Sequence, residues 1–219
     1  MIIKTNYSVS KDTLKTIANI EIDIFRESLN EPTGDFFYDP WVIKPKFAGS
    51  AIEQALEILP DPIGEARLIT LESGTCYFAH SDIDDRYHLN ISGDCAALIN
   101  LETKQSWFLT NDGVWYDMDA GPTHSAASFG QHNRKQIVVR KLLKKNTLLK
   151  PKSMTITVGG TNPRFVFDNT ISPWLNRANK NKIITNFTKH QNGVSFDIEE
   201  NSINYLKSII PQHFNYTIS

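Results

Sequence analysis

The sequence predicts a mainly β fold, because short segments of strand character follow one another through the middle of the chain. Turn residues bound these segments, as at Glu72-Ser73-Gly74 and Asn111-Asp112-Gly113. Short strands at this spacing indicate a sandwich or a barrel, expected over residues 65–150. The expected strands are Ala66–Leu71, Thr75–Ala79, Arg86–Ile91, Cys95–Asn100, Gln105–Thr110, Val114–Met118 and Gln136–Leu142.

Residues 1–64 are expected to flank this core with helices and a loop. Ser10–Ser28 has helical periodicity with Ser10 or Asp12 as a cap, although alternating isoleucines in its second half equally fit a strand. A second helix is predicted over residues 49–59. The segment Asn30–Lys46 is rich in Pro, Gly and aromatic residues, and it is expected either to wall or cover a binding site or to pack on the core as a long connection.

Residues 151–219 are expected to form an appendage of mixed α/β structure. Met154–Val158 and Arg164–Phe167 have strand character, and Ser202–Ile209 is predicted as a short helix. Three roles stay open for this segment: completing the barrel, forming a separate domain on the substrate side, or making an oligomer contact.

The composition indicates one globular domain with a substantial core, or a domain with a small addition. The chain has 219 residues, 40% hydrophobic content and a net charge of −1. There is no apolar run of membrane-spanning length and no signal-peptide pattern, so a cytoplasmic location is expected. Cys76 and Cys95 are expected as small thiols buried in strands. The basic segment 134–152 is expected to be solvated, so nucleic-acid binding is not favoured.

Two histidines and an aspartate have the spacing of a metal site. In a strand, residues two apart share a face, so His80 and Asp82 can point at one ion where a strand ends. His124 lies 42 residues after Asp82, a separation that lets several short strands bring it back beside the pair. Two imidazoles and one carboxylate form the facial triad of non-haem iron(II) oxygenases.

The strand after this pair has one polar and one apolar face. Arg86, His88 and Asn90 alternate with apolar residues, so these three side chains line a cavity or face solvent. His88 fits a structural histidine as well. Arg134 opens another strand-like run, and its guanidinium has the shape to bind a carboxylate through two hydrogen bonds.

Taken together, these motifs resemble the iron(II)- and 2-oxoglutarate-dependent dioxygenases, in the aspartyl/asparaginyl β-hydroxylase-like branch that includes free-proline hydroxylases. The resemblance covers residues 65–143. It implies a double-stranded β-helix, also called a jelly roll or cupin-like fold, with the metal at its open mouth. Some aspartyl β-hydroxylases lack the carboxylate ligand, whereas this chain has Asp82.

The same resemblance implies specific roles for the site residues. His80, Asp82 and His124 match the iron ligands. Arg134, ten residues after the distal histidine, matches the arginine that pairs with the far carboxylate of 2-oxoglutarate. Arg86 and His88 match an Arg-x-His that also contacts this co-substrate. Iron(II), 2-oxoglutarate and dioxygen are therefore the expected cofactor and co-substrates, and a hydroxylated amino acid, free or in a polypeptide, is the expected product.

Two other kinds of metal protein fit the triad. A cupin-like metal-binding protein would not need Arg134 or Arg86, and a zinc hydrolase or isomerase would need a further base, for which His88 is available. The substrate stays open between an amino acid, a peptide and another small molecule. Trp107 and Trp115 flank the turn at residues 111–113 and are expected to pack as a cross-strand pair or to line the substrate pocket.

Overall fold

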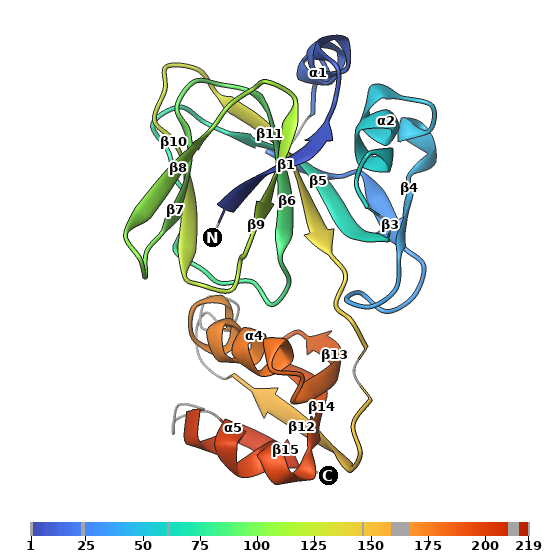
Figure 1. The fold of residues 1–219 in the computed structure, drawn as a ribbon, viewed down its shortest axis with the longest axis vertical. Coiled ribbons are helices and arrows are strands. Elements are labelled where there is room, and N and C mark those ends of the chain that lie inside the picture. Colours follow the sequence, from blue (N-terminus) through green and yellow to red (C-terminus); the bar gives the residue numbers. More distant parts are fainter. Residues whose placement is uncertain are drawn as a thin grey trace.

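The computed structural model describes residues 2–22, 25–60, 62–145, 147–158, 167–209 and 215–218. It is mainly β, as predicted, with two antiparallel sheets that face each other as a sandwich and a separate C-terminal sheet beneath them (Figure 1). The larger sheet has the strand order β1 (Ile2–Ser8), β9 (Val114–Met118), β6 (Arg86–Ser92), β11 (Arg134–Lys141), β5 (Ile63–Leu71) and β2 (Arg26–Ser28). The smaller sheet has the order β10 (His124–Ser128), β7 (Ala96–Asn100) and β8 (Gln105–Leu109).

One predicted strand, Thr75–Ala79, is wrong as a regular strand. This segment instead runs along β10 with isolated bridges at Cys76–Ala127 and His80–His124. His80 and His124 exchange both backbone hydrogen bonds, at 3.0 and 2.8 Å. The pairing sets the two imidazoles side by side, although 43 residues lie between the two histidines in the sequence.

The other six predicted strands are present with small shifts at their ends. Strand β10 was missed, because its sequence His-Ser-Ala-Ala-Ser has small residues and no alternation of polar and apolar side chains. All five of its residues are buried, which is the pattern of a strand covered on both faces. Of the two alternatives for the polar face of β6, the enclosed one holds: Arg86, His88 and Asn90 are all buried, and Arg86 and His88 line the cavity.

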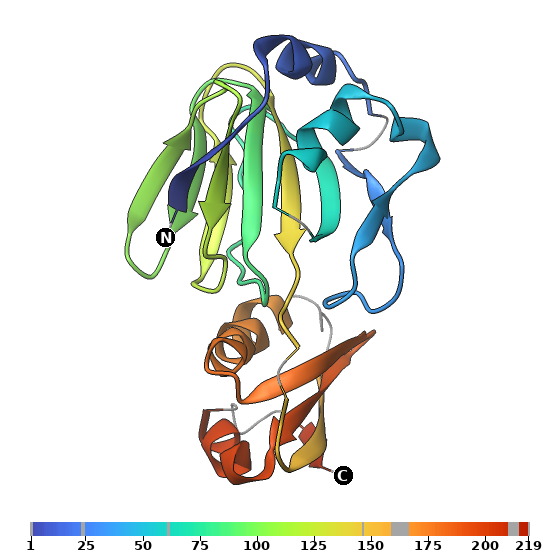
Figure 2. The ribbon, with the colours of Figure 1, turned by 45° about the vertical axis from the view of Figure 1, so that its right-hand side comes forward.

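The outer face of the larger sheet packs against two N-terminal helices (Figure 2). Helix α1 (Lys11–Ala18) is capped by Ser10, whose hydroxyl accepts a hydrogen bond from the backbone N–H of Thr13 at 3.0 Å. It ends at Ala18, so the helical prediction is wrong for the second half of its range, which leads into strand β2. Asp23 and Ile24 lie outside the described residues. Helix α2 (Ala51–Glu57), capped by Ser50, confirms the second prediction.

The segment between β2 and α2 is more regular than a loop. It forms a hairpin of β3 (Asn30–Pro32) and β4 (Trp41–Ile43), followed by the 3-10 helix η1 (Pro45–Phe47). At the turn of this hairpin, Phe37 and Tyr38 are buried in a hydrophobic cluster formed mostly by the C-terminal part of the chain. The hairpin thereby fixes the sandwich against the C-terminal sheet.

The C-terminal part has its own four-stranded sheet and its own hydrophobic cluster. Among the described residues, none of its strands pairs with a strand of the sandwich, so it does not extend the barrel. The predicted strand at Arg164–Phe167 lies outside the described residues up to 166, and Phe167 begins a π-helix. The strand order is β13 (Ile184–His190), β14 (Gly193–Glu199), β12 (Pro151–Thr157) and β15 (Asn215–Ile218), and the helical elements are η2 (Phe167–Ile171), α4 (Ser172–Lys180), η3 (Glu200–Ser202) and α5 (Ile203–Ile209).

Two further predictions about side chains are wrong. Cys76 and Cys95 are both free and exposed. Cys76 lies in the irregular segment beside β10, and Cys95 lies in the turn before β7 with a φ of 54°. Trp115 is fully buried in the cluster under the helices, whereas Trp107 packs against the cluster between the sheets, so they form neither a cross-strand pair nor part of the cavity wall. Across the described ranges, no helix has the length and apolar character needed to cross a membrane.

Candidate metal centre

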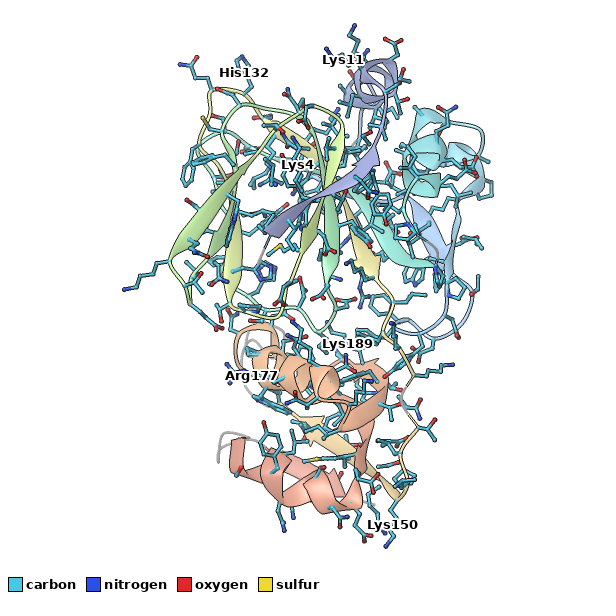
Figure 3. The ribbon with its side chains drawn as sticks, in the orientation of Figure 1. Lys4, Lys11, His132, Lys150, Arg177 and Lys189 are labelled. Atoms are coloured by element: carbon cyan, nitrogen blue, oxygen red, sulfur yellow. The ribbon has the colours of Figure 1, made fainter. Side chains whose placement is uncertain are left out.

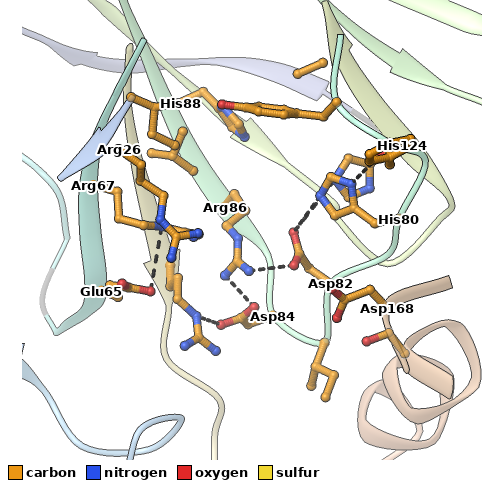
Figure 4. A pocket seen from close by; sticks show the side chains of 18 of the residues that line it. Arg26, Glu65, Arg67, His80, Asp82, Asp84, Arg86, His88, His124 and Asp168 are labelled. Atoms are coloured by element: carbon orange, nitrogen blue, oxygen red, sulfur yellow. Dashed lines mark hydrogen bonds and ion pairs between the residues drawn. The ribbon is translucent and has the colours of Figure 1, made fainter. Parts of the chain in front are cut away.

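The structure brings His80, Asp82 and His124 together at one end of the sandwich. The Oδ2 atom of Asp82 lies 4.0 Å from Nε2 of His80 and 3.7 Å from Nε2 of His124. One ligand atom from each of the three residues lies within 4.8 Å of the other two. These are two nitrogen donors and one oxygen donor on one side of a common point, with the opposite side open to a cavity (Figure 4).

Backbone carbonyls orient both imidazoles. Nδ1 of His80 lies 2.8 Å from the carbonyl oxygen of Phe78, and Nδ1 of His124 lies 2.9 Å from that of Pro122. Because a carbonyl oxygen only accepts hydrogen bonds, Nδ1 is the protonated nitrogen in the neutral form of each imidazole, and Nε2 then has the free lone pair. This arrangement, in which the outer nitrogen is tied to the protein, is typical of metal-binding histidines.

The third donor is held as a carboxylate. Oδ1 of Asp82 accepts an ion-pair contact from Nη2 of Arg86 at 2.8 Å, which leaves Oδ2 facing the imidazoles. Burial disfavours the charged form, but the charge of Arg86 first, and then the electrostatic interactions with the two imidazoles, outweigh it and hold the pKa of Asp82 well below its usual range. Burial also lowers the pKa of His124, which favours the neutral form that binds metals.

A buried ionic network holds Arg86, the partner of Asp82, in place. Asp84, whose exposed fraction is 2%, accepts hydrogen bonds from both Arg86 and Arg140. The guanidinium of Arg140 in turn stacks on the ring of Phe36, 3.9 Å from its centroid. The network therefore links the hairpin of residues 30–43 to the metal-ligand candidate Asp82 through two arginines and one aspartate.

The triad opens into a cavity of about 900 Å³ between the sandwich and the C-terminal part. Phe36 and Phe37 line it, which confirms that part of the segment 30–46 walls the cavity. The backbone N–H of Ser81 donates to the carbonyl of Asp168 at 3.0 Å, so the C-terminal part contacts the His-x-Asp motif directly. The residues of the C-terminal part that line the cavity are Phe167, Asp168, Asn169, Ser172 and Lys189.

The residues expected to hold the co-substrate lie at two depths. Arg86 and His88 line the cavity, whereas Arg134 is fully buried one layer behind it. Nη2 of Arg134 donates to Oε1 of the cavity-lining Gln136 at 2.6 Å, and Nη1 donates to the carbonyl of Ala97 at 2.9 Å. Burial lowers the pKa of Arg134 to about 10, and no acidic residue in the described ranges pairs with it.

His88 lies beside this arginine and is neutral. Its Nδ1 is 3.4 Å from Oε1 of Gln136, and its buried Nε2 has no hydrogen-bond partner in the described part of the chain. Burial first, and the charge of Arg134 second, lower the pKa of His88 to about 3. An uncompensated guanidinium and an unsatisfied imidazole nitrogen at the same end of the cavity are features that a carboxylate ligand would satisfy.

The neutral state of His88 predicts a pH dependence of stability. Its folded pKa lies below the value of 6.5 expected in the unfolded chain, so the unfolded state binds the proton first and stability is lost as pH falls from about 6.5 toward 3. Between pH 7 and pH 5 we expect this residue to cost about 2 kcal/mol in urea unfolding of the metal-free protein. His88→Gln should reduce the loss, whereas the exposed His132→Gln should not; equal losses in both would show that His88 is not buried and neutral.

Sequence reasoning missed several charged residues of the cavity. Arg26, Glu65 and Arg67 line it from β2 and β5, and Asp84 and Arg140 complete its floor. The available signal was parity: Glu65, Arg67 and Ile69 alternate with the buried apolar residues that face the helices. The alternation along β5 is visible in the sequence, but the sequence does not indicate that the polar face of this strand is enclosed by other parts of the chain.

Comparison of the sequence with known protein families and with curated proteins finds no match in either.

Proposed function

We propose that this chain is an iron(II)- and 2-oxoglutarate-dependent dioxygenase that hydroxylates an unactivated C–H bond, most consistently in an amino acid, free or within a polypeptide. The observation that carries the proposal is the convergence of two carbonyl-tethered imidazoles and one arginine-bound carboxylate on a common point at the mouth of a cavity. This donor set fits a divalent metal such as iron(II) and leaves coordination positions open on the cavity side.

The strand connections support a jelly-roll form of the sandwich. Along the chain, β5, β6, β9 and β11 belong to the larger sheet, while the segment at residues 75–80 and strands β7, β8 and β10 belong to the smaller side. The chain thus crosses repeatedly between two antiparallel sheets, as in a double-stranded β-helix. In this arrangement the His-x-Asp motif and the distal histidine face each other at one open end.

The residues divide the work of such a site. His80, Asp82 and His124 would hold the metal, and Arg86 keeps the carboxylate of Asp82 ionised and fixed in orientation. When bound, iron and 2-oxoglutarate together supply the oxidising power by which dioxygen hydroxylates a C–H bond. The protein contributes the open positions, the orientation of the ligands, and walls from Phe36 and Phe37 that exclude water.

The far end of 2-oxoglutarate fits the site formed by Arg134, Gln136 and His88. The buried guanidinium lacks an acidic partner among the described residues, and Nε2 of His88 lacks a hydrogen-bond partner there. A carboxylate that displaces the Gln136 amide would receive charge-assisted hydrogen bonds in a buried setting, where they are stronger than at the surface.

A metal hydrolase is the main alternative, and the state of His88 disfavours it. A general base works best when its pKa is near the operating pH. The pKa of His88 is lowered to about 3, so it would be a weak base at neutral pH. In a cupin-like protein without oxygenase activity, Arg134 would act only through its hydrogen bonds to Ala97 and Gln136, and its buried charge would have no anionic ligand.

An anaerobic titration tests the proposal. We expect the metal-free protein to bind iron(II) and then, on addition of 2-oxoglutarate, to show the weak visible charge-transfer band of the chelate. Iron binding without the band would favour the cupin-like or hydrolase alternative. Absence of iron binding at micromolar concentrations would contradict the metal centre itself.

Arg134→Lys is expected to weaken 2-oxoglutarate binding at least tenfold and to leave iron binding unchanged. A lysine ammonium cannot form the paired hydrogen bonds of a guanidinium, and it is harder to desolvate in this buried position. The concentration of 2-oxoglutarate at half-maximal band intensity measures the effect. An unchanged value would show that Arg134 has only a structural role, through its bonds to Ala97 and Gln136.

A further inference from the structure

Two arginines on one wall of the cavity have no role in the site described so far. Arg26 on β2 lies opposite Ile69 of β5, and Arg67 is two residues before Ile69. Because side chains two apart in a strand share a face, Arg26, Ile69 and Arg67 point to the same side of the sheet, and all three line the cavity. Figure 4 shows the two arginines beside each other, across the cavity from His80 and His124.

The positive charge of this wall is only partly compensated. Glu65 is the acidic neighbour of Arg67, with 3.7 Å between Oε2 and Nε, and that Nε atom has no hydrogen-bond partner within the described ranges. The side chain of Arg26 makes neither an ion pair nor a hydrogen bond to the residues that the structure describes. One carboxylate therefore faces two guanidiniums, although like charges on adjacent strands repel each other.

The other acidic groups of the cavity do not face this wall. Asp82 and Asp84 bind Arg86 and Arg140, and Asp168 lies on the far side of Asp82 from Arg26 and Arg67 (Figure 4). Arg67 is largely buried, with an exposed side-chain fraction of 16%, so water compensates its charge poorly. Burial and the charge of Arg86 lower the pKa of Arg67 to about 10, which leaves it protonated at neutral pH. An anion in the cavity would relieve this imbalance.

We propose that Arg26 and Arg67 bind a carboxylate of the substrate, which makes the substrate a carboxylic acid or a polypeptide segment with an acidic side chain. This inference rests on the proposed dioxygenase function. Paired guanidiniums match a carboxylate in geometry and in charge. Arg26 and Arg67 line the same cavity as His80, Asp82 and His124 and lie across it from them, so a molecule anchored at this wall would extend toward the metal centre (Figure 4).

The wall and the expected co-substrate end lie on different strands of the same sheet. Arg26 and Arg67 belong to β2 and β5, whereas Arg134 and Gln136 belong to β11 and His88 to β6. Arg67 and His88 are both in register with Val138 of β11, and Arg26 and Gln136 are both in register with Ile69 of β5. The carboxylates of co-substrate and substrate would therefore occupy neighbouring parts of one cavity.

The test uses protein loaded anaerobically with iron(II) and 2-oxoglutarate, so that the co-substrate end is filled. The probes are the free L-amino acids, each compared with its carboxamide, and aspartate and glutamate also compared with asparagine and glutamine. We expect at least one acid to perturb the charge-transfer band with an affinity at least tenfold higher than that of its amide. Arg26→Gln and Arg67→Gln should each weaken this binding at least tenfold, while Arg177→Gln, on an exposed face of α4, should not.

The outcomes separate this inference from the proposed function. If Arg67→Gln abolishes the band itself while iron still binds, the wall holds 2-oxoglutarate, and the inference is overturned although the dioxygenase stands. If the wild type shows no band, the proposed function fails first. If no acid binds more tightly than its amide, the carboxylate site is overturned.

A second measurement does not depend on any ligand. Because Arg26 has no ion-pair partner in the described ranges, Arg26→Gln should leave the Tm of the ligand-free protein unchanged or raise it by up to about 3 °C. A fall of several degrees would show that Arg26 stabilises the fold, which would contradict a site kept for an anion. Arg177→Gln is again the matched control.

Discussion

His124→Ala is expected to weaken iron(II) binding more than about a hundredfold and to abolish the visible band with 2-oxoglutarate. The expected effect is large because His124 supplies one of only three protein donors, and changes even to residues that merely orient such ligands cost about 10- to 100-fold. The hydrogen bond from Nδ1 to the carbonyl of Pro122 leaves Nε2 as the donor, so alanine removes the donor completely. The anaerobic titration described above measures both quantities.

His132→Ala provides the matched control. The side chain of His132 is exposed and, among the described residues, pairs only with Asp94. It lies at the end of the sandwich far from the C-terminal sheet (Figure 3). It should retain the iron affinity and the band of the wild type. If His124→Ala retained them as well, while both variants melted like the wild type, His124 would not be a metal ligand.

Asp84→Asn is expected to lower the free energy of unfolding by about 3 kcal/mol or more. Removing one partner of a buried ionic network leaves uncompensated charge in a medium that solvates it poorly, which typically costs about 3–5 kcal/mol. Here both Arg86 and Arg140 would lose their shared carboxylate, and both are buried. Such a loss is a large fraction of the net stability of a typical domain. Urea unfolding of the metal-free protein measures it.

Asp112→Asn removes an exposed ion pair, in contrast to the buried network around Asp84. Asp112 pairs with Lys4 at 2.6 Å, and both side chains are strongly exposed, at 42% and 51%. Exposed pairs contribute at most about 1 kcal/mol, so this variant should unfold close to the wild type. Equally small losses in the two variants would mean that Asp84 is solvated in solution, and would remove the support that the network gives to Asp82.

Sequence patterns predicted those strands and helices that depend mainly on their own residues. Alternation and turn residues located β5, β6, β7, β8, β9 and β11, and capping residues located the starts of α1 and α2. Strand β10 escaped prediction because its small residues, buried on both faces, have no alternation. Thr75–Ala79 was predicted as a strand but makes only isolated bridges to β10. The second half of the Ser10–Ser28 segment was ambiguous between helix and strand. Residues 20–22 form neither, and only Arg26–Ser28 is a strand, through its pairing with the distant β5.

The same distinction holds for the candidate site. The sequence by itself determined which residues have the chemistry of a metal site, since the spacing of His80 and Asp82 and the later His124 are visible in one dimension. Only the tertiary structure decided what surrounds them. It placed Asp84 between Arg86 and Arg140, set Arg134 behind Gln136 rather than in the cavity wall, and enclosed Arg26 and Arg67 beside the C-terminal part. The reason is physical: donor identity belongs to single residues, whereas burial and the pairing of charges depend on contacts between segments far apart in the chain.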